Sequence, residues 1–297
     1  MKILVLGSSG FLGKNFINLK KKTNNSYYYF SNSTKKWAET EFFQCDLNNQ
    51  KKFEAKIKKI KPNLCIDLSW HGIPDYSKKN NEINLSIKKK IYKTLIKNSC
   101  KKIITIGSCW EYGDCSGIKK ESEVKKSNAN DFAKTKLKVL KILDNYHKKK
   151  IIDYVWLRLF FVYGIYGKKT SLLESLVKKF KKNQKFTPKN KNSYNDFIYI
   201  NDVIRYIDFF VSKKKFKSGV YNLGYGKSSN NNDFVETFNK LISNKQEVFK
   251  YNYSTKLGLI SNMSKTNKYT KIKPIYNIKK GLKDYLIRTE LLDNYNK

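Results

Sequence analysis

The sequence predicts an α/β fold in which a doubly wound parallel sheet is followed by a smaller C-terminal portion. Strand-like and helix-like segments alternate through the N-terminal half, a glycine-rich turn joins the first pair, and the C-terminal third becomes mainly helical. Such alternation is typical of a parallel sheet covered by helices on both faces. A chain of 297 residues is long enough for one large α/β domain or two smaller ones.

The N-terminal half reads as five strands with helices between them. Short apolar runs bounded by polar residues predict the strands, and apolar residues at helical spacing predict the helices. The strands are Lys2–Leu6, Tyr27–Phe30, Leu64–Leu68, Ile103–Ile106 and Val155–Phe161, and the helices are Asn15–Lys22, Phe53–Ile60, Asn84–Asn98 and Phe132–His147.

The C-terminal third contains one short apolar strand, several amphipathic helices and a turn-rich stretch. The strand is Phe197–Ile200, the helices are Leu172–Phe180, Val203–Val211, Asn232–Ile242 and Ile278–Leu286, and the turn-rich stretch is Lys185–Asn195. We expect that stretch to be a surface loop rather than a linker between independent domains.

The charge is strongly unbalanced, with 62 Lys and Arg against 24 Asp and Glu, a formal net charge of +38. Such a charge is typical of nucleic-acid-binding proteins. However, the only arginines are Arg158, Arg205 and Arg288, and arginine is the residue that contacts phosphates and bases through paired hydrogen bonds. Lys and Asn are enriched together along the chain, which indicates a compositional bias. We therefore expect a solvated lysine surface and no nucleic-acid partner.

Membrane, export and metal-binding signals are absent from the sequence. No apolar run reaches the roughly 18–20 residues of a membrane span, and the N-terminal run enters a glycine turn without a signal-peptide cleavage site. The five cysteines form no C-x-x-C pair, so neither a zinc site nor a disulfide framework is expected. We expect a protein of the reducing cytoplasm with no membrane partner and no metal.

The strongest local motif is the turn between the first strand and the first helix, a G-x-x-G-x-x-G sequence. Glycines let the backbone approach a pyrophosphate, and the N–H groups of the following helix bind its charge. An ordinary glycine turn is the alternative. The motif predicts a Rossmann-like dinucleotide site at Gly7, Gly10, Phe11, Leu12 and Gly13.

The end of the second strand bears on the choice between NAD and NADP. A carboxylate there would bind the ribose 2′-hydroxyl of NAD and repel the 2′-phosphate of NADP. The chain instead has Ser31 and Asn32, followed by Lys35, which suit a phosphate. NADP is therefore the preferred cofactor and NAD the alternative. Asp46 and Leu47, which follow the next apolar pair, are expected near the adenine.

Taken together, the motifs resemble the extended short-chain dehydrogenase/reductase family, in its nucleotide-sugar epimerase/dehydratase/reductase subgroup. The resemblance covers essentially the whole chain and is carried, in order, by the glycine turn, Asp46-Leu47, Ser108 with Tyr112-Gly113, Leu157-Arg158 with Val162-Tyr163-Gly164, Asp196-Phe197-Ile198-Tyr199 with Asp202-Val203, and Asn222-Leu223-Gly224. It implies a dinucleotide-binding domain over residues 1–164 and a mostly substrate-binding portion over 165–297, with 195–212 returning to the first domain.

The resemblance also implies a catalytic Ser, Tyr and Lys, of which one is missing. Ser108 and Lys136 match the family pattern, whereas Phe132 stands at the tyrosine position. Loss of a positioned acid–base group costs on the order of 10²–10⁴ in rate. Three explanations remain open: an engineered Tyr-to-Phe variant that traps substrate, a natural enzyme with another donor (water, Cys109, Tyr112 or a substrate hydroxyl), or a catalytically silent homologue.

The remaining site residues are assigned by the same resemblance. The cofactor is expected to contact Leu68, Ser69, Trp70, Lys136, Leu159 and Val162, and the sugar His71, Ser108, Cys109, Trp110, Phe161 and Asn195. Family members often carry Asn and Arg at the positions of Phe161 and Asn195, where they touch the nucleotide diphosphate. This departure disfavours a UDP-sugar 4-epimerase.

The chain length and Trp110-Glu111-Tyr112 look closer to the 4-keto-6-deoxyhexose reductases, such as those making CDP-linked abequose or paratose. The expected function is NAD(P)H-dependent reduction of a 4-keto-6-deoxy sugar on a nucleotide diphosphate, for surface-polysaccharide synthesis. An epimerase with tightly bound NAD and a silent nucleotide-sugar-binding homologue are the alternatives. The resemblance also implies a homodimer formed through Asn84–Asn98 and Phe132–His147.

Overall fold

The computed structural model describes residues 1–32, 42–113, 115–124, 129–243 and 253–291. The chain divides into two compact units. Unit 1 is Met1–Asp114, Val124–Arg158 and Ile207–Tyr221, and unit 2 is Cys115–Glu123, Leu159–Tyr206 and Asn222–Lys297. The two units are thus interleaved along the chain. Among the described helices, none combines the length and apolarity needed to cross a membrane.

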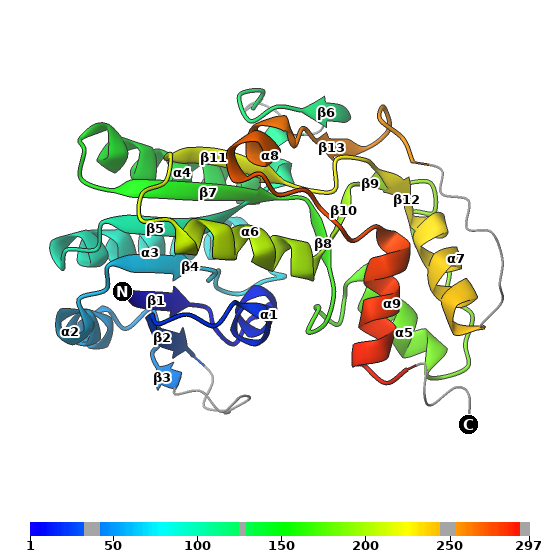
Figure 1. Cartoon of the computed structure of the whole chain (residues 1–297), viewed down its shortest axis with the longest axis horizontal. Coiled ribbons are helices and arrows are strands. Elements are labelled where there is room, and N and C mark those ends of the chain that lie inside the picture. The colour runs from blue at the N-terminus through cyan, green and yellow to red at the C-terminus, as the bar shows by residue number, and fades with distance from the viewer. Residues whose placement is uncertain (33–41, 114, 125–128, 244–252, 292–297) are drawn as a thin grey trace. The chain divides into compact units, whose positions relative to one another are not determined.

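Unit 1 is built on a seven-stranded sheet of strand order β11-β7-β5-β4-β1-β2-β3 (Figure 1). The strands are β1 Lys2–Leu6, β2 Ser26–Ser31, β3 Phe42–Gln44, β4 Leu64–Asp67, β5 Lys102–Ser108, β7 Asp153–Leu159 and β11 Gly219–Leu223. Strand β1 pairs in parallel with β2 on one side and β4 on the other. The chain therefore reverses direction across the sheet at β1 and β4, and in doubly wound folds this switch point is where ligands bind. The predicted α/β fold class is confirmed.

Helices cover both faces of this sheet (Figure 1). They are α1 Phe11–Leu19, α2 Gln50–Ile60, α3 Lys78–Lys97, α4 Asp131–Lys148 and the part of α6 (Ile200–Ser212) that belongs to unit 1. The side chains of Asn49, Ser77 and Asn130 each accept a backbone N–H at a helix start, which satisfies donors that the helix leaves open. Apolar residues of α2, α3 and α4 pack on the strands, including Phe53, Ile57, Ile91, Leu95, Val139 and Leu143.

The described residues of unit 2 form two small β structures and five helical segments. Strands β6 Gly117–Lys119, β9 Tyr194–Asn195, β12 Ser229–Asn230 and β13 Leu259–Ser261 form one sheet, and β8 Phe161–Tyr163 pairs with β10 Phe197–Tyr199. The helices are α5 Leu172–Phe180, α7 Asn231–Ile242, α8 Ser264–Thr270, α9 Ile278–Arg288 and the start of α6. Buried Asp196 accepts N–H bonds from Tyr225 and Ser261 at 2.6 and 2.9 Å, which holds these segments together.

Several predicted boundaries differ from the structure. The helix predicted from Asn84 begins at Lys78, because its first turns bury asparagines rather than apolar residues. The predicted strand Val155–Phe161 ends at Leu159, and Phe161 begins β8 with a different partner. Ile200 begins α6 instead of ending a strand. The predicted loop at Lys185–Asn195 ends in β9, since strands of two or three residues are set by non-local pairing and carry no periodicity.

Candidate dinucleotide and sugar site

The glycine turn lies between β1 and the first turn of α1. Gly7 has φ +73°, and a Cβ there would lie 2.8 Å from the Ser69 Cα atom. A Cβ on Gly13 would collide with the Gly7 carbonyl oxygen and the Ser8 backbone. Gly10 precedes α1 and supplies no side-chain cap, so the first N–H groups of the helix remain available. This arrangement fits a pyrophosphate at the helix N-terminus.

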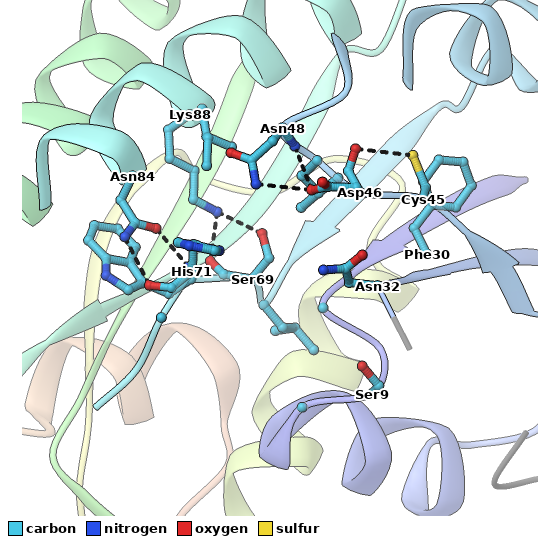
Figure 2. Close-up of a pocket in the computed structure, with 17 residues that line it drawn as sticks. Ser9, Phe30, Asn32, Cys45, Asp46, Asn48, Ser69, His71, Asn84 and Lys88 are labelled. Carbon is cyan, nitrogen blue, oxygen red and sulfur yellow. Dashed lines mark hydrogen bonds between the residues drawn. The ribbon is translucent and has the colours of Figure 1, made fainter. Parts of the chain in front are cut away.

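A cavity of about 270 Å³ opens beside this turn (Figure 2). Its walls come from the turn, the ends of β2 and β3, the loop after β4 and the inner face of α3. The lining residues are Gly7, Ser9, Gly10, Phe30, Asn32, Cys45, Asp46, Leu47, Asn48, Leu68, Ser69, Trp70, His71, Gly72, Asn84, Ile87 and Lys88. The cavity therefore follows the carboxyl edge of the sheet across the switch point, where doubly wound folds bind ligands.

Most of the predicted cofactor residues of unit 1 line this cavity. Gly7, Gly10, Asn32, Asp46, Leu47, Leu68, Ser69 and Trp70 do so, together with His71, which was predicted for the sugar. Ser31 is buried and its carbonyl oxygen accepts the Cys45 N–H. Phe11, Leu12 and Gly13 lie in the first turn of α1. Lys35 lies outside the described residues.

At one end of the cavity, Asp46 stabilises its own turn rather than pointing freely into solution. Its Oδ1 atom accepts N–H bonds from the backbone and side chain of Asn48 at 2.9 and 3.0 Å. Asn32 follows β2 on the neighbouring wall (Figure 2). Among the described lining residues at this end, the only carboxylate is that of Asp46.

Beneath the loop after β4, Lys88 and Asp67 form a buried ion pair that sequence reasoning missed. The Lys88 Nζ atom lies 2.7 and 2.6 Å from the two Asp67 carboxylate oxygens and also donates to the Ser69 carbonyl and hydroxyl oxygens. Tyr92 donates to the same carboxylate. Burial by itself would raise the pKa of Asp67, but the Lys88 charge and these hydrogen bonds outweigh it, so the pKa is lowered. The pair anchors Ser69 at the cavity wall.

Lys136 is buried in α4, and no carboxylate of the described residues forms an ion pair with it. Its Nζ atom donates to the Ile106 carbonyl oxygen at 2.9 Å and lies 3.8 Å from the centre of a Trp70 ring. Burial, followed by repulsion from Lys88, lowers its pKa to about 7. Trp70 thus lies against both the cavity and Lys136. Its buried indole N–H has no hydrogen-bond partner among the described residues, which fits a ligand atom accepting there.

Ser108 ends β5 in a hydrogen-bonded turn. Its Oγ atom accepts the Trp110 N–H at 3.2 Å, while its own N–H donates to Glu111 at 2.7 Å. Glu111 is buried and held by Arg158 Nε at 2.8 Å and by the Trp156 indole N–H at 3.1 Å. The Ser108 hydroxyl oxygen accepts a hydrogen bond in this turn. Its O–H can still donate a hydrogen bond to a ligand oxygen.

Aromatic rings surround the position where the resemblance implies a tyrosine. Phe132 is only 7% exposed. Its ring centre lies 5.4 Å from that of Trp70, 5.7 Å from that of Trp110 and 5.0 Å from that of Tyr76. The structure brings the predicted residues Trp70, Trp110 and Phe132 together, and Cys109 lies buried in the adjoining turn. Tyr76 was missed because its loop has no periodic signal.

The other predicted residues belong to unit 2. Leu159 ends β7, while Phe161 and Val162 lie in β8. The Phe161 ring packs on Phe197 at 6.3 Å between centres. The Asn195 amide donates to Asn231 at 2.8 Å. Their part in the site stays a prediction.

Comparisons with known proteins agree with this fold. The model of the NAD dependent epimerase/dehydratase family matches residues 3–224. The chain is 24% identical over 318 residues to the uncharacterized protein MJ1055 of Methanocaldococcus jannaschii, and the match covers 95% of this chain and 94% of that protein.

Two solved structures show the likeness of fold. The UDP-glucose 4-epimerase of Thermotoga maritima, with UDP-glucose, has a TM-score of 0.79 at 17% identity and covers 98% of this chain and 100% of that one. The dTDP-glucose 4,6-dehydratase of Bacillus anthracis, in complex with NAD, has a TM-score of 0.80 at 19% identity, with 99% and 98% covered. Because the family model matches most of its length, this chain belongs to the NAD dependent epimerase/dehydratase family.

Proposed function

We propose that this protein binds a nicotinamide dinucleotide in the unit 1 cavity and reduces a 4-keto-6-deoxy sugar carried on a nucleotide diphosphate. One observation supports this above the others: the cavity runs from the glycine turn to Trp70, and Trp70 contacts Lys136 and Phe132. Cofactor and reacting sugar would therefore meet at this ring cluster. The solved relatives with UDP-glucose or NAD support the ligand classes.

Each group of residues has a separate part in this reaction. The bound dinucleotide supplies the hydride. Gly7, Ser9 and Gly10 would hold its pyrophosphate at the start of α1. Ser108 would position the sugar oxygen through a hydrogen bond from its hydroxyl, and the Lys136 side-chain nitrogen would hold the nicotinamide ribose. The packed rings around Phe132 would exclude water from the reacting carbon.

Phe132 favours reduction over epimerisation. An epimerase must first remove a proton from a sugar hydroxyl, which needs a base of lowered pKa beside that hydroxyl. A reductase needs only a proton donor for the oxygen that gains charge. The Phe132 ring offers no base, so an epimerase would need another base for its oxidative step and another acid for its reductive step, whereas a reductase needs only the acid.

The decisive assay combines NADPH with CDP-linked and dTDP-linked 4-keto-6-deoxyglucose and follows both reduced nicotinamide and the sugar product. Net consumption of NADPH with formation of the 4-hydroxy sugar is the expected result. An epimerase is the second candidate, supported by the relatives that carry this activity. Interconversion of UDP-glucose and UDP-galactose without net NADPH consumption would favour it. Binding without either reaction would show a silent homologue.

We also propose that NADP is preferred over NAD. Among the described cavity residues, Asn32 follows β2 where a carboxylate would repel a 2′-phosphate, and the nearby Asp46 carboxylate is occupied by Asn48. Calorimetric titration should give a Kd for NADPH about tenfold or more below that for NADH. Equal or tighter binding of NADH would overturn the preference and leave the site itself in place.

We further propose a homodimer in the cytoplasm, formed through α3 and α4. Both helices pack side by side on one face of the unit 1 sheet (Figure 1) and present lysines outward, among them Lys89, Lys93 and Lys141. The mass in solution, measured by light scattering at physiological and low salt, tests this. A monomer at every concentration and salt would contradict it.

A further inference from the structure

We propose that Tyr76 supplies the proton that the residue at position 132 cannot, so that this chain has moved its catalytic phenol from α4 to the loop before α3. This inference rests on the proposed reduction and names its acid. The phenol that is missing at position 132 would then be replaced by the one at position 76.

The Tyr76 ring packs against two members of the aromatic cluster around Phe132. Its centre is 5.0 Å from that of Phe132 and 5.4 Å from that of Trp110, both at steep angles. It is 38% exposed, unlike Phe132, and among the described residues its hydroxyl forms no hydrogen bond. A partly exposed phenol whose hydroxyl has no hydrogen-bond partner among the described residues is available to a ligand.

The backbone around Tyr76 is held firmly, as a catalytic position requires. Asn81 donates from its buried side chain to the Tyr76 carbonyl oxygen at 2.9 Å. Asn80 donates to the carbonyl oxygens of His71 and Asp75, and Asn84 both donates to and accepts from the His71 backbone. The first turns of α3 therefore bind the loop that joins the cavity to Tyr76.

Neither protein donor considered from the sequence is as well placed. Tyr112 is fully buried with the Arg158 guanidinium 4.5 Å from its ring centre. Cys109 is buried and takes part in another interaction. Tyr76, by contrast, touches the Phe132 ring directly. Burial raises the pKa of Tyr76 above its usual value, so the phenol stays protonated at neutral pH and suits an acid rather than a base.

The proposed reduction needs only the keto sugar, the reduced nicotinamide and one proton that solvent replaces. The carbonyl carbon of the sugar accepts a hydride from the reduced nicotinamide, and the carbonyl π pair moves to the oxygen. That oxygen takes the proton from the Tyr76 hydroxyl, and water then returns a proton to the phenolate. The ketone is reduced to an alcohol, and the nicotinamide is oxidised.

A four-protein cycle tests the assignment: wild type, Tyr76→Phe, Phe132→Tyr and the double variant. Single-turnover oxidation of NADPH is measured with dTDP-4-keto-6-deoxyglucose and its CDP counterpart, and the Kd values of NADPH, dTDP and CDP are measured by calorimetry. Tyr76→Phe should lower the rate by roughly 10²–10⁴-fold with little change in these Kd values. In the Phe132→Tyr background the same substitution should change the rate by less than about threefold, because the restored phenol replaces it.

Tyr146→Phe is the matched control. It removes a phenol at the far end of α4, about 21 Å along the helix axis from Phe132, and should leave the rate unchanged. An equal loss from Tyr76→Phe in both backgrounds would show a structural or sugar-packing role and overturn the proposal. Equal rates for wild type and Tyr76→Phe would overturn it while the reductase function stands. No turnover by any of the four, with NADPH still bound, would overturn both.

Discussion

At the residue scale, Gly13 and Gly10 of the first turn differ in how much space an added side chain would have. Gly13 has no room for a side chain, because a Cβ would collide with backbone atoms of Gly7 and Ser8. At Gly10 only the Gly7 carbonyl oxygen lies within 4 Å of an added Cβ, at 3.2 Å. Under the proposed function, the glycine at position 10 leaves room for the pyrophosphate to approach the backbone.

Gly10→Ala should weaken NADPH binding by about tenfold or more, while the free energy of unfolding changes by about 1 kcal/mol or less. Gly13→Ala should destabilise the fold by about 1–3 kcal/mol, because the added methyl overpacks the turn. Calorimetry and urea denaturation measure the two effects. A Gly10→Ala protein that binds NADPH as tightly as wild type would argue against a pyrophosphate at this turn.

The protonation state of the Lys136 side chain changes near neutral pH. Its pKa falls from 10.5 to about 7 in the folded protein, so between these values the unfolded chain binds the proton and the folded chain does not. Stability due to this residue therefore rises with pH through that window and is lowest below pH 7.

Lys136→Met should remove this pH dependence. Between pH 7 and pH 9 the wild type should gain about 2 kcal/mol of unfolding free energy relative to the variant, since each pH unit contributes about 1.4 kcal/mol. Urea denaturation of both proteins across pH 6–9 measures the difference. A constant gap between them would mean that the buried amine keeps an ordinary pKa.

At the element scale, β4 and α3 are joined through a polar contact as well as by apolar packing. Asp67 is the last residue of β4, and Lys88 lies in the middle of α3 on its buried face. Both side chains are almost fully buried. The pair holds the loop after β4 against the cavity, and its position explains why a helix of lysine-rich sequence has a lysine on its inner side.

Lys88→Met should destabilise the protein by about 3–5 kcal/mol, because it leaves the Asp67 carboxylate buried without its counter-charge. The double variant Asp67→Asn/Lys88→Met should recover much of this loss, since neither residue is then charged. Denaturation of the two variants and of Asp67→Asn gives the coupling free energy. Additive losses would show that the two side chains act independently.

At the scale of the whole molecule, the formal charge of +38 bears on both stability and ligand association. Asp67, Glu111, Asp196 and Asp202 are buried among the described residues, so part of the small acidic complement is withdrawn from the surface. Lys88, Lys136 and Arg158 are buried as well, so the surface keeps a large excess of positive charge. The like charges of the lysines repel one another in the folded state. Their combined field attracts polyanions such as dinucleotides and nucleotide sugars.

Sodium chloride should therefore raise the melting temperature and slow NADPH association. Between 10 and 300 mM salt, screening of self-repulsion worth about 1 kcal/mol would raise Tm by roughly 2–4 °C. Scanning calorimetry and stopped-flow binding measure the two effects. A Tm that falls across this range would show that favourable surface ion pairs outweigh the repulsion.

The sequence by itself determined the longer strands and helices, the glycine turn and the absence of a hydroxyl at position 132, because periodicity, turn chemistry and residue identity are local properties. The confirmed strand β1 and the helix α5 show this most clearly. Short strands such as β3 and β11 were missed, because they are set by their neighbours in the sheet. Only the tertiary structure decided that Trp70 and Tyr76 pack on Phe132 and that Asp67 pairs with Lys88. These contacts join residues from different elements, and no local pattern records which distant side chains will share one buried site.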